Sequence, residues 1–201
     1  MFYAFIRILA FIVLMPIFFI RVKGKENLKV EGGSVIIANH TSNWDPIILG
    51  FIVKHTPVCY MAKKELYSNG VKRLFLRLLQ TIPVERGKGD LKAVKTALSA
   101  LKDGKMLGIF PEGTRKGGEN GEIGPFEQGA ALLALRADVP VIPVYLHAGG
   151  YRLFHRVTAY AAPPVYLRDV VGERTSSSAI GGATEYLREQ MIELREKSCR
   201  S

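Results

Sequence analysis

Short β-branched apolar runs alternate with helix-like segments along most of the chain, and this alternation limits the possible folds more than any other feature. Residues 34–38 (SVIIA) follow a glycine pair and predict a buried strand. Residues 90–102 predict a helix, with Asp90 as the N-terminal cap, Gly104 as the stop, and apolar side chains at helical spacing at Leu91, Val94, Leu98 and Leu101. Strands separated by helices predict an α/β domain with a mixed, largely parallel sheet flanked by helices. Further strands are expected at 58–62, 106–110, 141–146 and 157–161, and further helices directly after Ser42 or Asn43, at 71–79, at 129–136 and at 184–197.

The length of 201 residues allows one domain, or one domain with a small appendage. With 48% apolar and 23% charged residues the chain can bury a core, which excludes disorder as its general state. The sequence has no internal repeat and no long linker that would divide its body. A single domain is therefore expected to hold the functional site.

The chain is strongly basic, with 28 Lys and Arg residues against 18 Asp and Glu residues and a formal net charge of +10. Its partner is expected to be anionic: a phosphorylated small molecule, an anionic membrane face or a nucleic acid. A nucleic-acid site would need aromatic residues interleaved with a basic stripe or a known module, and the sequence has neither. The nucleotide loops G-x-G-x-x-G and G-x-x-x-x-G-K-[ST] are absent, as is the serine hydrolase motif G-x-S-x-G. A phosphorylated small molecule and an anionic membrane remain.

The two cysteines, Cys59 and Cys199, lie far apart and in no Cys/His spacing typical of zinc sites. Neither a disulfide framework nor a structural metal site is predicted. A reducing, cytosol-facing location is the simplest interpretation.

The N-terminal residues 2–20 are almost wholly apolar, although Arg7 and Pro16 interrupt the run. Such a segment can be a marginal transmembrane helix, a signal peptide core, an anchor in one leaflet or a core helix. A signal peptide would be followed by a small-residue cleavage site, and a soluble helix would have a polar face; this segment has neither. We therefore expect a membrane-anchoring helical segment at 1–24 and the main domain at 25–201, on the cytoplasmic face of the cell membrane. The basic residues that an anionic leaflet would attract are Arg21, Lys23, Lys25 and Lys29.

The segment 39–45 (NHTSNWD) follows the first predicted strand and leads into a helix, a position where α/β sheets place functional residues. His40 and Asp45 would point about 140° apart in a continuous helix, but across a strand-to-helix turn they can meet. The helix dipole favours the Asp45 carboxylate, which can accept a hydrogen bond from one ring nitrogen of His40. The other nitrogen is then a base that can take a proton from an alcohol. The alternatives are a capped turn with an incidental histidine, or a metal site for which a third ligand is missing.

A second polar motif, 110–115 (FPEGTR), follows another predicted strand and should emerge at the same edge of the sheet. Arg115 offers a planar fork suited to a phosphate, and Thr114 and the Gly113 backbone offer further donors. Glu112 can accept a hydroxyl or pair with the arginine. Taken alone, the motif is also compatible with an exposed turn.

A third motif, 82–86 (IPVER), brings a second arginine, Arg86, after an apolar run. An ordinary solvated surface would explain this arginine equally well on its own. Together the motifs are far more specific, because four blocks in order resemble the glycerolipid acyltransferase family, most closely its bacterial 1-acyl-sn-glycerol-3-phosphate acyltransferases. The matching blocks are NHTSNWD at 39–45, IPVER at 82–86, FPEGTR at 110–115 and VPVIPV at 139–144.

The resemblance implies a role for each motif residue. His40 would be the general base and Asp45 the partner that orients it. The residues implied to bind the glycerol phosphate of the acceptor are Arg86, Glu112, Gly113 and Arg115.

The implied reaction moves a fatty acyl group from acyl-CoA or acyl-carrier protein to the sn-2 hydroxyl of lysophosphatidic acid, and gives phosphatidic acid. The acceptor is a membrane lipid, which agrees with the expected anchor. The chemistry requires no metal or organic cofactor. No covalent enzyme intermediate is expected either, because neither cysteine lies in a motif.

One position departs from the family pattern. Many members carry a lysine two residues before the glycine at the position of Gly129, whereas this chain has Glu127. This difference bears on the details of acceptor or donor binding. Two alternatives stay open: a family member that acylates another lysophospholipid, glycerol 3-phosphate or a non-glycerol lipid, or a non-catalytic lipid-binding membrane protein. The intact pair of His40 and Asp45 argues against the second alternative.

Overall fold

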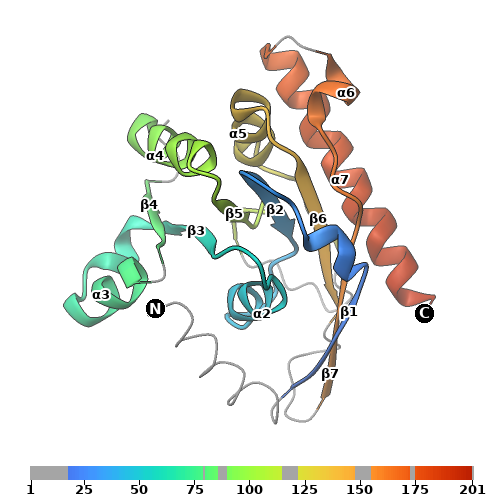
Figure 1. The fold of residues 1–201 in the computed structure, drawn as a ribbon, viewed down its shortest axis with the longest axis horizontal. Helices are drawn as coiled ribbons and strands as arrows, with labels where there is room; N and C mark the ends of the chain where they lie inside the picture. The colour runs from blue at the N-terminus through green and yellow to red at the C-terminus, as the bar shows by residue number, and fades with distance from the viewer. Residues whose placement is uncertain are drawn as a thin grey trace.

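The computed structural model describes residues 18–78, 80–85, 90–114, 122–147, 155–172 and 175–200. Their strands form one sheet in the order β1-β7-β6-β2-β5-β3-β4 (Figure 1). The strands are β1 (Phe18–Lys23), β2 (Ser34–Ala38), β3 (Val58–Lys63), β4 (Ile82–Val84), β5 (Met106–Ile109), β6 (Val141–His147) and β7 (His155–Ala161). The α-helices are α2 (Asp45–Ile52), α3 (Gly70–Leu78), α4 (Leu91–Lys102), α5 (Gly129–Ala137), α6 (Leu167–Val171) and α7 (Ser177–Cys199), and the 3-10 helices are η1 (Lys25–Leu28) and η2 (Lys64–Tyr67).

Five neighbouring strands, β6, β2, β5, β3 and β4, run parallel to one another. The other two strands run the opposite way, because β7 pairs antiparallel with β6 and β1 pairs parallel with β7. The carboxyl ends of the five parallel strands therefore meet at one edge of the sheet. This arrangement confirms the predicted mixed, largely parallel sheet.

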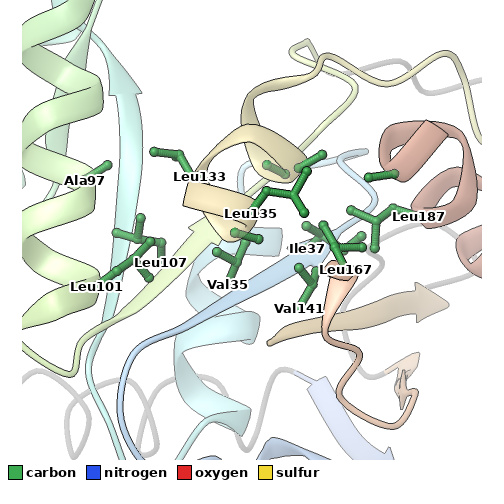
Figure 2. Close-up of a cluster of buried hydrophobic side chains, with 14 of the residues drawn as sticks. Val35, Ile37, Ala97, Leu101, Leu107, Leu133, Leu135, Val141, Leu167 and Leu187 are labelled. Atoms are coloured by element: carbon green, nitrogen blue, oxygen red, sulfur yellow. The ribbon is translucent and has the colours of Figure 1, made fainter. Parts of the chain in front are cut away.

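Both faces of the central sheet are buried, which explains the continuous apolar run of β2. On one face Val35 and Ile37 join side chains from α4, α5, α6 and α7, as Figure 2 shows. On the other face Ile36 and Ala38 pack with residues of α2. All five residues of β2 are buried, as expected for a central strand of a parallel sheet.

Helix α4 shows how the packing differs from the pattern in the sequence. Asp90 caps the helix as predicted, with its side chain accepting from the Ala93 backbone N–H at 2.9 Å. Leu91, however, is 71% exposed. The buried side consists of Ala93, Ala97, Ala100 and Leu101, because small side chains let the helix lie close to its neighbours.

Two other helices also differ in detail from the predictions. Helix α2 has Trp44 rather than Ser42 or Asn43 at its N-cap, and the Ser42 hydroxyl accepts from the Trp44 N–H at 3.3 Å. Helix α7 begins at Ser177, seven residues before the predicted start, because Ser176 caps it and its two glycines continue the helix.

The expected helical anchor at 1–24 needs correction at its carboxyl end. Residues 18–23 form β1, an edge strand whose backbone pairs with β7, so the sheet begins no later than Phe18. In the sequence, this apolar edge strand cannot be distinguished from the end of an anchor, because the strand that pairs with it lies more than 130 residues further along the chain. Residues 1–17 lie outside the described residues. Within the described part of the chain, no helix is long and apolar enough to cross a membrane.

Candidate active site

The site begins at the end of β2, where two hydrogen bonds connect Asn39 to the neighbouring strand β6. Asn39 is 3% exposed, and its side-chain amide donates to the Leu146 carbonyl at 3.1 Å. The Oδ1 atom of the same side chain accepts from the Leu146 N–H at 2.7 Å. This two-way pairing ties the residue before His40 to the sheet.

His40 and Asp45 form the predicted pair across the strand-to-helix turn. His40 Nδ1 lies 2.9 Å from Asp45 Oδ2. The Asp45 side chain has no exposure, whereas the His40 side chain keeps 18%. The imidazole is therefore the member of the pair that a substrate can reach.

The Asp45 carboxylate is fixed by the first residues of the turn. Its Oδ2 also accepts from the backbone N–H groups of Thr41 at 2.6 Å and Ser42 at 2.7 Å. Because this oxygen accepts these bonds, Nδ1 of a neutral His40 carries the proton and donates to it. The lone pair of His40 then lies on Nε2, where a general base needs it.

An aromatic side chain from the second motif supports the imidazole. The Phe110 ring stacks on the His40 ring with centroids 4.3 Å and planes 24° apart. The Tyr60 ring of β3 stacks on the Phe110 ring with their centroids 6.2 Å apart. The Tyr60 hydroxyl donates to the Pro46 carbonyl at 2.6 Å. The imidazole is thus held between α2, β3 and the end of β5.

Glu112 links the two motifs directly. Its side chain is buried, with 5% exposure. Oε1 accepts from the His40 backbone N–H at 3.5 Å, and Oε2 accepts from the Gly124 N–H at 3.3 Å. In this structure the carboxylate therefore holds the turn together, a contribution that the sequence did not predict.

The turn after Glu112 contains Gly113 and Thr114, but it uses the Gly113 N–H within itself, so the backbone donor predicted at Gly113 is not available to a phosphate. Gly113 has a φ of +70°, a left-handed conformation that favours glycine, and its N–H donates to the Phe110 carbonyl at 3.0 Å. Thr114 is exposed. Glu127 lies beside this turn: its backbone N–H donates to the Pro111 carbonyl at 2.7 Å, and a Cβ built on Gly113 would lie 3.3 Å from its Cγ.

Comparison with known proteins now gives the family. The model of the family described as Acyltransferase matches residues 19–147, which is more than half of the chain and contains all four sequence blocks. The chain belongs to the acyltransferase family. The predicted resemblance is confirmed at this level, and the domain makes this acyltransferase an enzyme.

Individual relatives agree with this membership. The acyltransferase is 31% identical over 182 residues to the 1-acyl-sn-glycerol-3-phosphate acyltransferase of Bacillus subtilis, covering 89% of each chain. It is 35% identical over 134 residues to the protein of the same name from Pseudomonas aeruginosa, covering 65% of this chain and 50% of that one. The crystal structure of the 1-acyl-sn-glycerophosphate acyltransferase PlsC from Thermotoga maritima matches with a TM-score of 0.70 and 25% identity, covering 92% of this chain and 74% of that chain.

Two of the seven predicted site residues of the acyltransferase, Arg86 and Arg115, lie outside the described residues. The structure brings together the other five: His40, Asp45, Glu112, Gly113 and Thr114. Among the described residues, no group of three His, Cys, Asp or Glu side chains is placed to hold a metal ion.

Sequence reasoning missed three residues that shape this site. Asn39 and Phe110 each open a motif, so their positions were visible in the sequence, but the residues that they contact were not. Tyr60 lies in β3 and gave no signal, because its role depends on the order of strands in the sheet.

Proposed function

We propose that this acyltransferase moves a fatty acyl group from acyl-CoA or acyl-carrier protein to the sn-2 hydroxyl of lysophosphatidic acid, and thereby forms phosphatidic acid. The observation that carries the proposal is the 2.9 Å contact between His40 Nδ1 and Asp45 Oδ2, directly beside the turn that contains Gly113 and Thr114. The relatives named 1-acyl-sn-glycerol-3-phosphate acyltransferase support the choice of acceptor.

The proposed step is a direct transfer without a covalent enzyme intermediate. His40 Nε2 takes the proton of the acceptor hydroxyl while the hydroxyl oxygen attacks the thioester carbonyl carbon. The C–O bond forms, the C–S bond breaks, and the leaving thiolate takes the proton back from the His40 imidazolium. Asp45 stabilises that imidazolium and fixes its orientation. Backbone N–H groups would stabilise the oxyanion between the two bond changes.

The acceptor phosphate is proposed to bind at the 110–115 turn. The Thr114 hydroxyl and Arg115 would supply donors, and Arg86 would add a second positive charge. Glu112 would act as the buried wall of this subsite, because its carboxylate already accepts two backbone N–H groups.

A membrane location on the cytoplasmic face is part of the proposal, with the apolar N-terminal residues as the anchor. The strand β1 sets the limit for a truncation test, because removal of residues 18–23 would also remove an edge of the sheet. Deletion of 1–17 should weaken sedimentation with vesicles and leave activity toward a detergent-solubilised acceptor. A deletion that leaves vesicle binding unchanged would show that the anchor lies elsewhere.

The experiment that tests the reaction is an acceptor panel. Purified protein is given a labelled acyl donor with lysophosphatidic acid, another lysophospholipid, glycerol 3-phosphate or monoacylglycerol. Lysophosphatidic acid should be used best, and Arg115→Lys should raise its KM more than that of the acyl donor. A preference for any other acceptor would replace lysophosphatidic acid in the proposal, and turnover of none would contradict it.

A further inference from the structure

We propose that η2 and α3 form a membrane-docking surface, in addition to the anchor proposed for residues 1–17, which binds an anionic lipid bilayer. Three aliphatic side chains on these two neighbouring elements point into solvent. Leu66 is 48% exposed, Val71 is 80% exposed and Leu74 is 60% exposed. Val71 and Leu74 are three residues apart on one helix, so they lie on the same face. Soluble proteins usually bury such a face against a neighbouring element.

These apolar side chains lie in a strongly basic segment. Residues 63–78 contain five basic residues and one acidic residue. The exposed side chains of Arg73 and Arg77 belong to α3, and Lys64 pairs with Glu85 at the end of β4. A helix with exposed aliphatic residues and several arginines or lysines is typical of segments that lie in the interface of an anionic membrane.

Helix α3 lies at the outer end of the sheet and is hydrogen-bonded to the rest of the domain. Its main packing partner is η2, and it lies beside the outermost strand β4 (Figure 1). The Thr81 hydroxyl donates to the Leu76 carbonyl at 2.7 Å and bonds the Tyr67 hydroxyl, with the two oxygens 2.5 Å apart. These bonds join both elements to the start of β4.

The location of this surface suits an enzyme that takes its acceptor from a membrane. η2 starts directly after the carboxyl end of β3, and His40 follows the carboxyl end of β2 at the same sheet edge. Docking of η2 and α3 would therefore bring the edge that carries His40 toward the bilayer. The inference does not depend on which lipid is acylated, because it rests on the surface alone.

A lipid bilayer fits these observations better than an acidic protein or a second copy of the chain. A second copy would bring the same positive charge against this surface, which is unfavourable. An acidic protein would pair with the arginines, but its charges would not explain why the apolar side chain of Val71 has only a fifth of its surface covered. A bilayer offers both an anionic headgroup layer and an apolar layer beneath it.

A fluorescent probe tests the proposal at one position. Leu74→Cys is made in full-length protein with Cys199→Ser and labelled with nitrobenzoxadiazole; Cys59 is buried and escapes the reagent. The matched control is Val170→Cys in α6, which follows the bridge at the start of β6 and so lies toward the opposite edge of the sheet. Vesicles of phosphatidylglycerol and phosphatidylcholine contain neither acyl donor nor lysophosphatidic acid, so failure here would leave the proposed reaction untouched.

With anionic vesicles, we expect the fluorescence of the probe at position 74 to increase and its emission maximum to shift to shorter wavelength. The fluorescence of the probe at position 170 should not change. The proposal would be overturned if the protein sediments with the vesicles but the probe at position 74 does not respond. It would also be overturned if the protein does not sediment with the vesicles at all. An equal response to pure phosphatidylcholine would overturn the role of charge. A response that needs only higher protein concentration, or an added acidic carrier protein, would assign the surface to a protein partner instead.

Substitutions at exposed positions give a second measurement. Arg73→Gln with Arg77→Gln should weaken vesicle binding roughly ten- to thirtyfold at low salt, since each basic residue near an anionic surface contributes about 1 kcal/mol. The control pair Lys102→Gln with Arg136→Gln removes the same charge from exposed positions at the ends of α4 and α5 and should have little effect. Equal losses in both pairs would mean that only net charge matters, and would contradict a specific docking surface.

Discussion

The ring of Phe110 stacks on the imidazole of His40 at a centroid distance of 4.3 Å, so one motif supplies the base and another holds it in place. His40 follows β2 and Phe110 follows β5, and these two strands are direct neighbours in the sheet. The orientation of the base therefore depends on the pairing of the two strands as well as on Asp45.

Replacement of Phe110 tests this support. Phe110→Leu should lower kcat about tenfold with little change in either KM, because a small misplacement of a catalytic group is costly in rate. Phe110→Tyr should keep the ring and most of the rate. The matched control is Phe126→Leu, which removes a partly buried aromatic ring from the other face of the sheet. Unchanged kcat in a folded Phe110→Leu protein would argue against a positioning role.

Glu127 provides a test of the proposed phosphate subsite. Its carboxylate lies beside the Gly113 turn and should repel an acceptor phosphate bound there. Glu127→Gln should lower the KM for lysophosphatidic acid by up to about fivefold at low salt, with a smaller effect in high salt. Glu189→Gln, on the exposed surface of α7, is the control. A raised KM for Glu127→Gln would mean that the carboxylate helps to bind the acceptor.

The two thiols should differ sharply in reactivity. Burial raises the pKa of the Cys59 thiol, whereas Cys199 is exposed. Alkylation at mildly alkaline pH should therefore modify Cys199 alone and leave Cys59 until the protein unfolds. Because the proposed transfer has no thiol intermediate, the singly alkylated enzyme should keep its activity. Inactivation in step with Cys199 modification, measured by mass spectrometry, would contradict the direct transfer.

The pH dependence of stability should reveal the cap of α4. The backbone N–H of Glu85 and that of Ala93 donate to the Asp90 carboxylate and lower its pKa. A carboxyl with a lowered folded pKa stabilises the protein above its unfolded pKa, and this contribution is lost as the pH falls through the folded value. In urea unfolding, Asp90→Ala should be less stable than wild type at pH 7, and the difference should narrow below about pH 4. A difference that is independent of pH would contradict the charge effect.

The parts of the site that the sequence predicted are local in the chain. His40 and Asp45 are five residues apart, and a strand end followed by a helix start is sufficient to bring them together. The Asn39 pairing with Leu146 spans 107 residues, and no local pattern carries that information. The same reason explains the missed strand β1, whose partner β7 begins at His155.

The packing of helices was predicted less well than their existence. Leu91 fits the apolar period of α4, yet it is exposed because the helix turns its alanines toward the core. Hydrophobic periodicity gives an apolar side of a helix, but the size of the available space decides which residues fill it.

The transfer rate of His40→Ala, measured with labelled acyl donor and lysophosphatidic acid, tests the central claim most directly. Removal of the general base should lower the rate by about 10² to 10⁴ in a protein whose unfolding matches wild type. Asp45→Asn should lose much of the same factor, and the double variant should lose little more than His40→Ala, because the two residues act as a unit. Formation of phosphatidic acid by folded His40→Ala at the wild-type rate would contradict the account.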